Sequence, residues 1–365
     1  MNIHILLTCV GSQVAPSVIQ TIRDHPRYEI KVVGVDNKKR GESIGAHFVD
    51  EYYQVPMGNE QSYIPELEEI VKKGEVKVLL PGSDEESLAL SRERHRFSRI
   101  GCAVACSDYE VTELVVDKYR LMERLKERSV PVADFFEFRT MSELRECAEK
   151  LGFPTKPFVI KPKISRGGRG FRVVQTAVSP LDDFLKGDTT TIDFDSLARI
   201  FEGAADEMDK FFVMDYLPGR KYSADVLVKQ GKMASVVIRN KIFPVGSPTQ
   251  VADIVFDKDL IAYALSIMEV LRFDYFVQFE IGRNPGGKPR LIEINPRLDA
   301  TLPICLGIGV NFYHEMINHA LGEEYSDSVM VSKDAQVLKR FFRYWQHCFV
   351  PVESIESDGV RTKWK

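Results

Sequence analysis

The sequence lacks the features that mark membrane proteins, secreted proteins and nucleic-acid platforms. No apolar run approaches the length of a membrane span, and the apolar stretch 5–10 is too short for a signal peptide and has no basic leader. A net charge of -4 disfavours a nucleic-acid partner. The six cysteines include no Cys-x-x-Cys pair, which is typical of reduced thiols. We therefore expect a cytoplasmic protein without membrane or nucleic-acid partners.

Three common enzyme motifs are also missing. The glycine-rich stretch 164–170 is not followed by Gly-Lys-Ser/Thr, so it is not a Walker loop. Gly11 and Asp36 are spaced faintly like the markers of a dinucleotide fold, but the full Gly-x-Gly-x-x-Gly is absent, which disfavours NAD. His314 and His319 lie too far apart around a helix to form a zinc protease motif.

An apolar strand over 290–297 carries polar side chains at every second position. Glu293, Asn295 and Arg297 share one face, because residues two apart in a strand point the same way. Two oxygen ligands beside a guanidinium suit a divalent metal bridged to phosphate, which is the composition of a Mg-ATP site. A solvated sheet face explains any single one of these residues equally well, but it explains the whole set less well.

A second strand is expected to supply a partner for this row. Residues 273–281 alternate polar with apolar side chains and are followed by an Asn-Pro-Gly-Gly turn, which predicts a hairpin with the strand over 290–297. Folding the hairpin should bring Gln278 towards Glu293 across the strand pair.

The segment 158–170, which precedes this hairpin in the sequence, is rich in basic residues and glycine. A short apolar strand that contains Lys161 leads into the glycine loop and then into another strand. The loop's backbone N–H groups, at Gly167 and Gly168 among others, can cradle phosphate, and Lys161, Arg166 and Arg169 would add charge-assisted bonds. An ordinary turn explains a glycine loop alone equally well.

A third segment, 211–227, consists of two strands that flank a Pro-Gly turn. Where the first strand breaks, at Asp215, Tyr216 and Leu217, free backbone groups can meet the edge of an adenine ring. We expect this segment to act as a hinge between lobes.

Taken in order, these pieces resemble the ATP-grasp superfamily, and within it the branch similar to the large chain of carbamoyl phosphate synthase, over residues 111–321. In that family a basic residue opens a helix before the glycine loop. The segment 117–122 matches this pattern, which implies that Lys118 touches ATP phosphate, and Lys161 matches the family's strand lysine.

The resemblance also implies roles for the hinge. Asp215, Tyr216 and Leu217 would border adenine, and Asp225 would lie behind the triphosphate. Lys221 departs from the pattern, because relatives usually have an acidic residue here that binds ribose hydroxyls. Ribose recognition therefore stays open, and Lys221 itself is expected to contact ATP.

For the metal, the resemblance implies that Gln278, Glu293 and Asn295 bind Mg²⁺, with Mn²⁺ as an alternative. A glutamine at position 278 agrees with the synthase-like branch. Arg297 matches the arginine that stabilises the transferring phosphoryl oxygens, and Lys161 and Arg169 would share this catalytic role.

The expected fold class is α/β, with α+β character in the central part. Apolar strands over 3–7, 30–35 and 76–80, with a helix over 15–24, indicate an open parallel lobe. The resemblance implies a pre-ATP-grasp domain whose loops help to build the acceptor site, with Asp84, Glu85 and Glu86 as candidates. The expected domains are 1–110 (pre-ATP-grasp), 111–210 (small lobe with the glycine loop), 211–321 (large lobe with the metal site) and 322–365 (a C-terminal extension).

Local signals predict several boundaries. Ser107-x-x-Glu110 is a capping box for a helix that runs to 128, and Thr140-x-x-Glu143 opens another helix that Gly152 closes. The aromatic stretch 337–350 predicts a packed terminal strand, in which Arg343 could face the acceptor pocket.

The expected activity is that of an ATP-dependent carboxylate–amine ligase. A carboxylate must be converted to an acyl phosphate before an amine can attack it, and ATP would do so with release of ADP and phosphate. One alternative is a subunit that phosphorylates bicarbonate or carbamate, as in carbamoyl phosphate synthase; the single ATP-grasp copy favours a free-standing ligase. The other is a catalytically silent nucleotide-binding module. The substrates would be small carboxylates and amines, and a homodimer is expected by analogy only.

Overall fold

The computed structural model describes residues 1–165, 168–179, 190–299 without 244–248, 301–324, 339–344 and 346–351. It divides the chain into two compact units. Unit 1 comprises Met1–Glu113, Tyr222–Glu280 and Ile294–Lys365, and unit 2 comprises Leu114–Lys221 and Ile281–Glu293. Both units are therefore assembled from segments that are distant in sequence.

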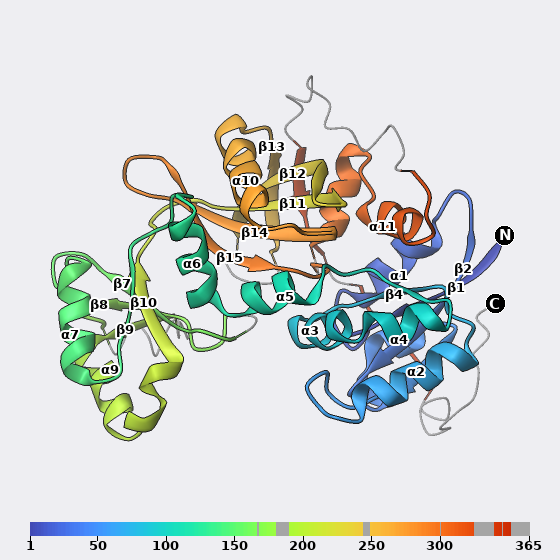
Figure 1. Ribbon diagram of the computed structural model, residues 1–365, viewed down its shortest axis with the longest axis horizontal. Helices are drawn as coiled ribbons and strands as arrows, with labels where there is room; N and C mark the ends of the chain where they lie inside the picture. Colours follow the sequence, from blue (N-terminus) through green and yellow to red (C-terminus); the bar gives the residue numbers. More distant parts are fainter. Residues whose placement is uncertain are drawn as a thin grey trace. The chain divides into compact units, whose positions relative to one another are not determined.

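The first sheet of unit 1 is parallel, with strand order β3-β2-β1-β4-β5 (Figure 1). Its strands are β1 (Asn2–Leu7), β2 (Glu29–Asp36), β3 (Glu51–Gln54), β4 (Val78–Leu80) and β5 (Ala103–Val104). The accompanying helices are α1 (Ala15–Arg23), α2 (Tyr63–Lys73), α3 (Asp84–Arg92) and α4 (Arg94–Arg99), with short 3-10 turns η1 (Arg40–Glu42) and η2 (Ile44–His47). The expected parallel lobe, with its strands and first helix, is confirmed.

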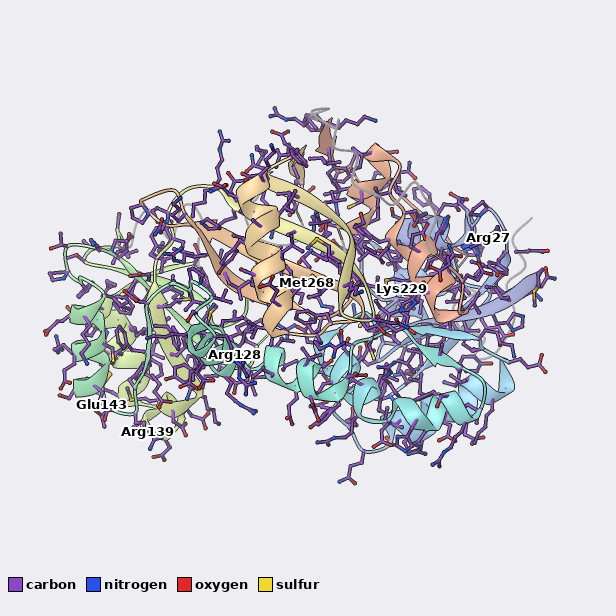
Figure 2. The ribbon with its side chains drawn as sticks, turned by 45° about the horizontal axis from the view of Figure 1, so that its top comes forward. Arg27, Arg128, Arg139, Glu143, Lys229 and Met268 are labelled. Carbon is purple, nitrogen blue, oxygen red and sulfur yellow. The ribbon has the colours of Figure 1, made fainter. Side chains whose placement is uncertain are left out.

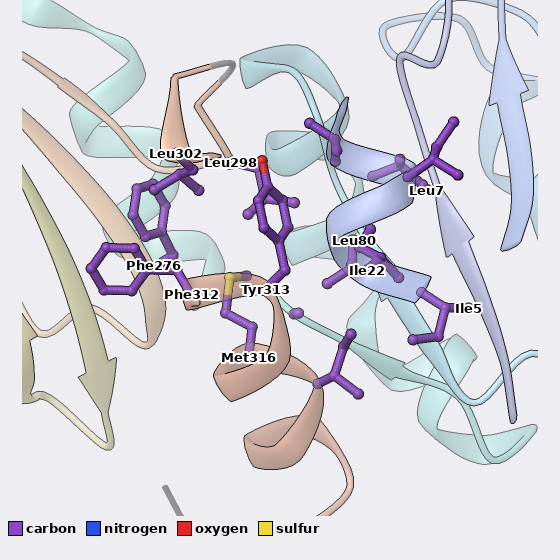
Figure 3. Close-up of a cluster of buried hydrophobic side chains, with 14 of the residues drawn as sticks. Ile5, Leu7, Ile22, Leu80, Phe276, Leu298, Leu302, Phe312, Tyr313 and Met316 are labelled. Atoms are coloured by element: carbon purple, nitrogen blue, oxygen red, sulfur yellow. The ribbon is translucent and has the colours of Figure 1, made fainter. Parts of the chain in front are cut away.

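Alternation along the strands of this sheet builds two cores. Ile5 and Leu7 of β1 pack with buried residues of α1 and of α11 (Phe312–Ala320), as Figure 3 shows for Ile22, Tyr313 and neighbouring side chains. Leu6, which points the other way, packs with buried residues of α2, α3 and α4. Both faces of the sheet are thus covered, as parallel sheets require.

The second sheet has strand order β15-β14-β11-β12-β13-β16. Its strands are β11 (Lys221–Lys229), β12 (Lys232–Phe243), β13 (Val251–Val255), β14 (Tyr275–Arg283), β15 (Pro289–Asn295) and β16 (Lys339–Phe342), and η4 (Leu302–Ile308) follows β15. Helix α10 (Lys258–Val270) accompanies this sheet (Figure 1). The predicted turn between β14 and β15 is present, because Asn284 accepts the N–H of Gly287. The terminal strand β16 forms, pairs with β13 and packs Phe341 against the core. It is shorter than the predicted stretch, and the side chain of Phe342 on its other face is 65% exposed.

The sheet of unit 2 has strand order β6-β10-β7-β8-β9. Its elements are β6 (Phe135–Glu137), β7 (Phe158–Pro162), β8 (Arg172–Gln175), β9 (Thr191–Asp193), β10 (Phe211–Asp215), α6 (Lys118–Glu127), α7 (Met141–Lys150), α9 (Phe194–Glu202) and η3 (Ala205–Lys210). Buried residues of α7 and α9 form one apolar core with this sheet. The strands predicted on either side of the glycine loop are therefore β7 and β8, which pair antiparallel.

Helix caps account for one correct and one wrong boundary. Thr140 Oγ1 accepts the N–H of Glu143, and Glu143 Oε2 accepts the N–H of Arg139 at 2.6 Å, so the predicted cap of α7 is confirmed (Figure 2). The single helix predicted up to 128 is wrong. Asp117 has extended backbone and its carboxylate accepts the N–H groups of the next turn, which starts a separate helix, α6, after α5 (Tyr109–Val116).

Among the described residues, no helix combines the length and the apolar character needed to cross a lipid bilayer.

Candidate functional site

Polar side chains from neighbouring strands of unit 1 form a buried, hydrogen-bonded cluster. Asp225 on β11 accepts from Nε and Nη2 of Arg239 on β12 at 2.5 and 2.8 Å. Gln278 on β14 donates from Nε2 to Asp225 Oδ1 at 3.0 Å. Asn295, at the end of β15, donates from Nδ2 to Gln278 Oε1 at 3.1 Å. Two of the three predicted metal ligands are thus in contact, although the partner of Gln278 is Asn295 and not Glu293 as expected.

The cluster continues through Arg297. Its Nη2 donates to Asn295 Oδ1 at 3.4 Å and its Nε to Asp84 Oδ1 at 3.2 Å. Asp299 lies 3.7 Å from Nη1 of Arg297 and 3.5 Å from Nη2 of Arg239, which closes a ring of polar contacts. Burial alone would raise the pKa of Asp299, but Arg239, Arg297, Lys241 and the backbone N–H of Thr301 together lower it.

Two basic residues of β12 were missed in the sequence. Arg239 is fully buried, and burial alone would lower its pKa, but the Asp225 carboxylate more than offsets that effect. Lys241 donates to Glu280 Oε2 at 2.6 Å, while Ser223 donates to Glu280 Oε1 at 2.8 Å. The available signal was a pair of basic residues two positions apart at the end of a largely apolar run, which places both on one face.

Unit 2 holds two lysines together with the remaining predicted ligand. Lys161, on β7, donates to the carbonyl of Ile292 at 2.7 Å and lies over the ring of Phe212. Lys118 donates to the carbonyl of Ser165 at 2.5 Å and lies 3.9 Å from Glu293 Oε2. Burial lowers the pKa of Lys161 to about 7, an effect that the nearby Lys118 reinforces and Glu293 opposes. An anion placed against these amines would restore the charge on Lys161.

The glycine loop is described in part. Gly168 and Gly170 adopt left-handed backbone conformations, with φ of 72° and 76°. Arg169 between them is exposed. Arg166 and Gly167, both predicted to contact phosphate, lie outside the described residues.

The predicted hinge connects β10 to β11 through a Pro-Gly turn, with Gly219 at φ 82°. Leu217 is buried, and burial raises the pKa of Asp215. Lys221 donates to the carbonyl of Leu217 and lies over the ring of Tyr216. Burial lowers the pKa of Lys221 to about 8. Lys221 therefore contacts the segment predicted to border adenine.

The donor set of the cluster fits a hard cation. Among the described residues, no group of three or more His, Cys, Asp or Glu side chains could hold a metal ion. The predicted ligands within the cluster are instead the amide oxygens of Gln278 and Asn295, which lie on the same buried face. Amide and carboxylate oxygens are the ligands that Mg²⁺ accepts, usually only one or two of them together with water and substrate phosphate.

Comparison with known proteins agrees with this fold. The family described as "ATP-grasp in the biosynthetic pathway with Ter operon" matches residues 207–340, which include the whole of the cluster apart from Asp84. The family described as "PylC-like, N-terminal domain" matches residues 5–105, the parallel lobe. The part of the chain that carries the cluster is therefore similar to an ATP-grasp family.

Individual relatives agree with this assignment. The carbamoyl phosphate synthase large chain of Rubrobacter xylanophilus is 24% identical over 316 residues, covering 83% of this chain and 28% of the relative. The formate-dependent phosphoribosylglycinamide formyltransferase of Bacteroides fragilis is 34% identical over 113 residues, covering 31% of this chain and 27% of the relative. The matched regions thus span little more than a quarter of these curated relatives.

Among solved structures, N5-carboxyaminoimidazole synthetase from Staphylococcus aureus, complexed with ADP, superimposes with a TM-score of 0.65. It is 14% identical, and the match covers 89% of this chain and 78% of that chain. At this level of identity the likeness supports the fold alone.

Proposed function

We propose that this protein is an ATP-dependent carboxylate–amine ligase that releases ADP and phosphate. The observation that carries the proposal is the buried contact of Gln278 with Asn295 beside Arg297, in an ATP-grasp fold. Two buried amides and a guanidinium contribute little apolar packing. Their presence in the core therefore favours a role in binding a polar ligand. The name of one relative includes formate, a carboxylate, which supports a carboxylate as the group activated.

The proposal assigns the phosphate groups of ATP to the basic residues of unit 2. Lys118 and Lys161 supply the positive charge, with Arg169 and the backbone of the glycine loop, Arg166 and Gly167 included. Because Lys161 is buried, its charge would act in a medium of low dielectric constant, where it stabilises phosphoryl oxygens strongly. Asp215, Tyr216 and Leu217 would border adenine, with Lys221 beside them.

The divalent cation would be held by Gln278, Glu293 and Asn295, and when bound it would neutralise the β- and γ-phosphate oxygens. Mg²⁺ is proposed, with Mn²⁺ as an alternative. Arg297 would stabilise negative charge on the transferring group, and its hydrogen bonds to Asn295 and Asp84 support this role because they orient the guanidinium.

The proposed reaction has two steps. The carboxylate oxygen of the acceptor attacks the γ-phosphorus of ATP, the bond to the β-bridging oxygen breaks, and ADP leaves. The amine nitrogen then attacks the acyl carbon, phosphate leaves with the electron pair of the C–O bond, and the nitrogen loses a proton. Water must be excluded between the steps, because an acyl phosphate hydrolyses.

The described cysteines are all free thiols, which supports the expected cytoplasmic location.

The relative with the longer match favours one second candidate, phosphorylation of bicarbonate or carbamate. ADP release with hydroxylamine in place of the amine separates the candidates. A ligase gives a hydroxamate with a particular acid, a bicarbonate-phosphorylating enzyme releases ADP only when bicarbonate is added, and a silent module does neither. A screen of amino acids and hydroxy acids would identify the acid, with Glu293→Gln as the control variant expected to lose the signal.

A further inference from the structure

The orientation of the Gln278 amide is determined by its neighbour on β11. A side-chain amide has a donating end and an accepting end, whereas an ionised carboxylate accepts only. Because Asp225 Oδ1 lies 3.0 Å from Nε2 of Gln278, the NH₂ end must face Asp225. The oxygen end therefore faces Asn295, whose own oxygen is directed at Arg297.

Asp225 is in turn held in position by several contacts. Arg239 binds it through two guanidinium nitrogens, and Cys305 Sγ lies 3.6 Å from its Oδ2. Arg239 is itself anchored by a hydrogen bond to Thr301 and by Asp299. A bidentate pair of this kind prevents rotation of the carboxylate.

Neither member of the pair can touch a nucleotide directly. The side chains of Asp225 and Arg239 are both 0% exposed. Burying an ion pair seldom contributes net stability compared with apolar residues of similar volume. Its presence beneath the amide of Gln278 is therefore better explained by positioning than by stability.

We propose that Asp225 and Arg239 are positioning residues that turn the amide oxygen of Gln278 towards the divalent cation and thereby set the affinity for that cation. The inference rests on the proposed function, because it takes Gln278 and Asn295 as ligands. Partners in contact with metal ligands typically change metal affinity by about 10- to 100-fold when they are replaced. The same range is expected here.

The first test is Asp225→Asn, measured by calorimetry of ADP binding with and without Mg²⁺. An amide at position 225 can donate as well as accept, so it no longer dictates which end of Gln278 faces it. The Mg²⁺-dependent gain in ADP affinity should fall by about 10- to 100-fold. ADP affinity without metal should stay within about twofold, because the pair does not reach the nucleotide.

The second test exchanges the two groups in Asp225→Asn/Gln278→Glu. The formal charge of the cluster is conserved, and a carboxylate at position 278 presents an oxygen to the cation whichever way it turns. The Mg²⁺-dependent gain should return to the wild-type value or exceed it. Asp50→Asn is the matched control, since Asp50 pairs with Arg23 at 2.7 Å in the same unit and far from the cluster in sequence; this variant should leave the gain unchanged.

The outcomes are distinguishable. If the wild type shows no Mg²⁺-dependent ADP binding, the proposed function fails. If the wild type shows it and Asp225→Asn retains it in full, the positioning role is wrong. Should Asp225→Asn fail to fold, the exchange variant decides: a folded exchange variant with wild-type metal dependence supports the role. An exchange variant that is folded without that dependence, or that is itself unfolded, contradicts it.

Discussion

Arg297 donates from Nε to Oδ1 of Asp84 at 3.2 Å, although 213 residues separate the two in the sequence. Asp84 opens helix α3 of the parallel lobe, and Arg297 follows the end of β15. Both side chains are mostly buried, with exposures of 15% and 18%. Asp84, which is a candidate residue of the acceptor site, thus orients Arg297, the proposed catalytic arginine.

Replacing Asp84 by Asn should slow the reaction more than it weakens the fold. Arg297 would keep Asn295 as a partner but lose a charge that fixes its orientation, and we expect the rate of substrate-dependent ADP release to fall about tenfold, equivalent to ~1.4 kcal/mol. KM for ATP should change little. Asp108→Asn serves as the control, because Asp108 pairs with Arg94 but its side chain is 82% exposed and such pairs contribute little. Equal rates for the two variants would contradict the role of Asp84.

The lowered pKa of Lys161 predicts that the protein takes up a proton when nucleotide binds. Its pKa of about 7 leaves the amine mostly neutral at pH 8 and mostly charged at pH 6. Bound phosphate favours the charged form and raises this pKa, so binding at pH 8 should take up a proton and binding at pH 6 much less. Calorimetry of ADP binding at both pH values, in two buffers of different ionisation enthalpy, measures the uptake. In Lys161→Met the uptake at pH 8 should vanish; its persistence there would assign the proton to another group.

Acid should destabilise the contact between α1 and α11. His314 Nε2 lies 2.7 Å from the carbonyl oxygen of Thr21, and burial lowers the pKa of His314 to about 4. An unfolded histidine titrates near 6.5. Between these pH values the unfolded chain binds more protons, so the stability contributed by neutral His314 is lost as pH falls from about 6.5 towards 4.

The experiment that tests this prediction measures the free energy of unfolding in urea at pH 7.5 and pH 5.0. The loss of stability on acidification should be smaller in His314→Gln than in the wild type, by about 1 kcal/mol once solvent screening of this partly exposed group is allowed for. His95→Gln removes an exposed histidine and should leave the loss as it is in the wild type. Identical acid sensitivity in all three proteins would show that other groups are responsible.

Two glycines of the glycine loop should differ in their tolerance of alanine. A Cβ at Gly170 would lie 2.6 Å from Cγ of Pro162, whereas a Cβ at Gly168 would meet nothing within 4 Å. Both have positive φ, which costs alanine about 1–2 kcal/mol. Overlap adds about 1–3 kcal/mol for Gly170→Ala alone. Thermal unfolding should therefore show the larger loss for Gly170→Ala, and similar melting temperatures would contradict this account.

Much of the fold follows from local patterns in the sequence. The apolar run that contains Ile5, Leu6 and Leu7 predicts a strand, and the cap at Thr140 predicts the start of α7. The wrong boundary had a local cause as well. Ser107 was read as a cap, but its hydroxyl donates to the carbonyl of Asp274, and Asp117 starts the second helix.

The site was predicted in its residue types but not in its contacts. Gln278 and Asn295 were expected as ligands, and the structure places them together. Arg239 was not singled out, because an arginine in an apolar strand is informative only when its partners are known. Those partners, Asp225 and Asp299, come from segments before and after it in the chain.

Short-range patterning thus specifies which segments become strands and helices, and which residues of each strand share a face, because these depend on steric preferences and on a period of two or 3.6 residues. Tertiary packing decides which faces meet. The closed ring from Arg239 through Gln278 to Arg297 requires strands far apart in sequence to align in one register. That alignment depends on burying the whole apolar core at once, so no single segment encodes it.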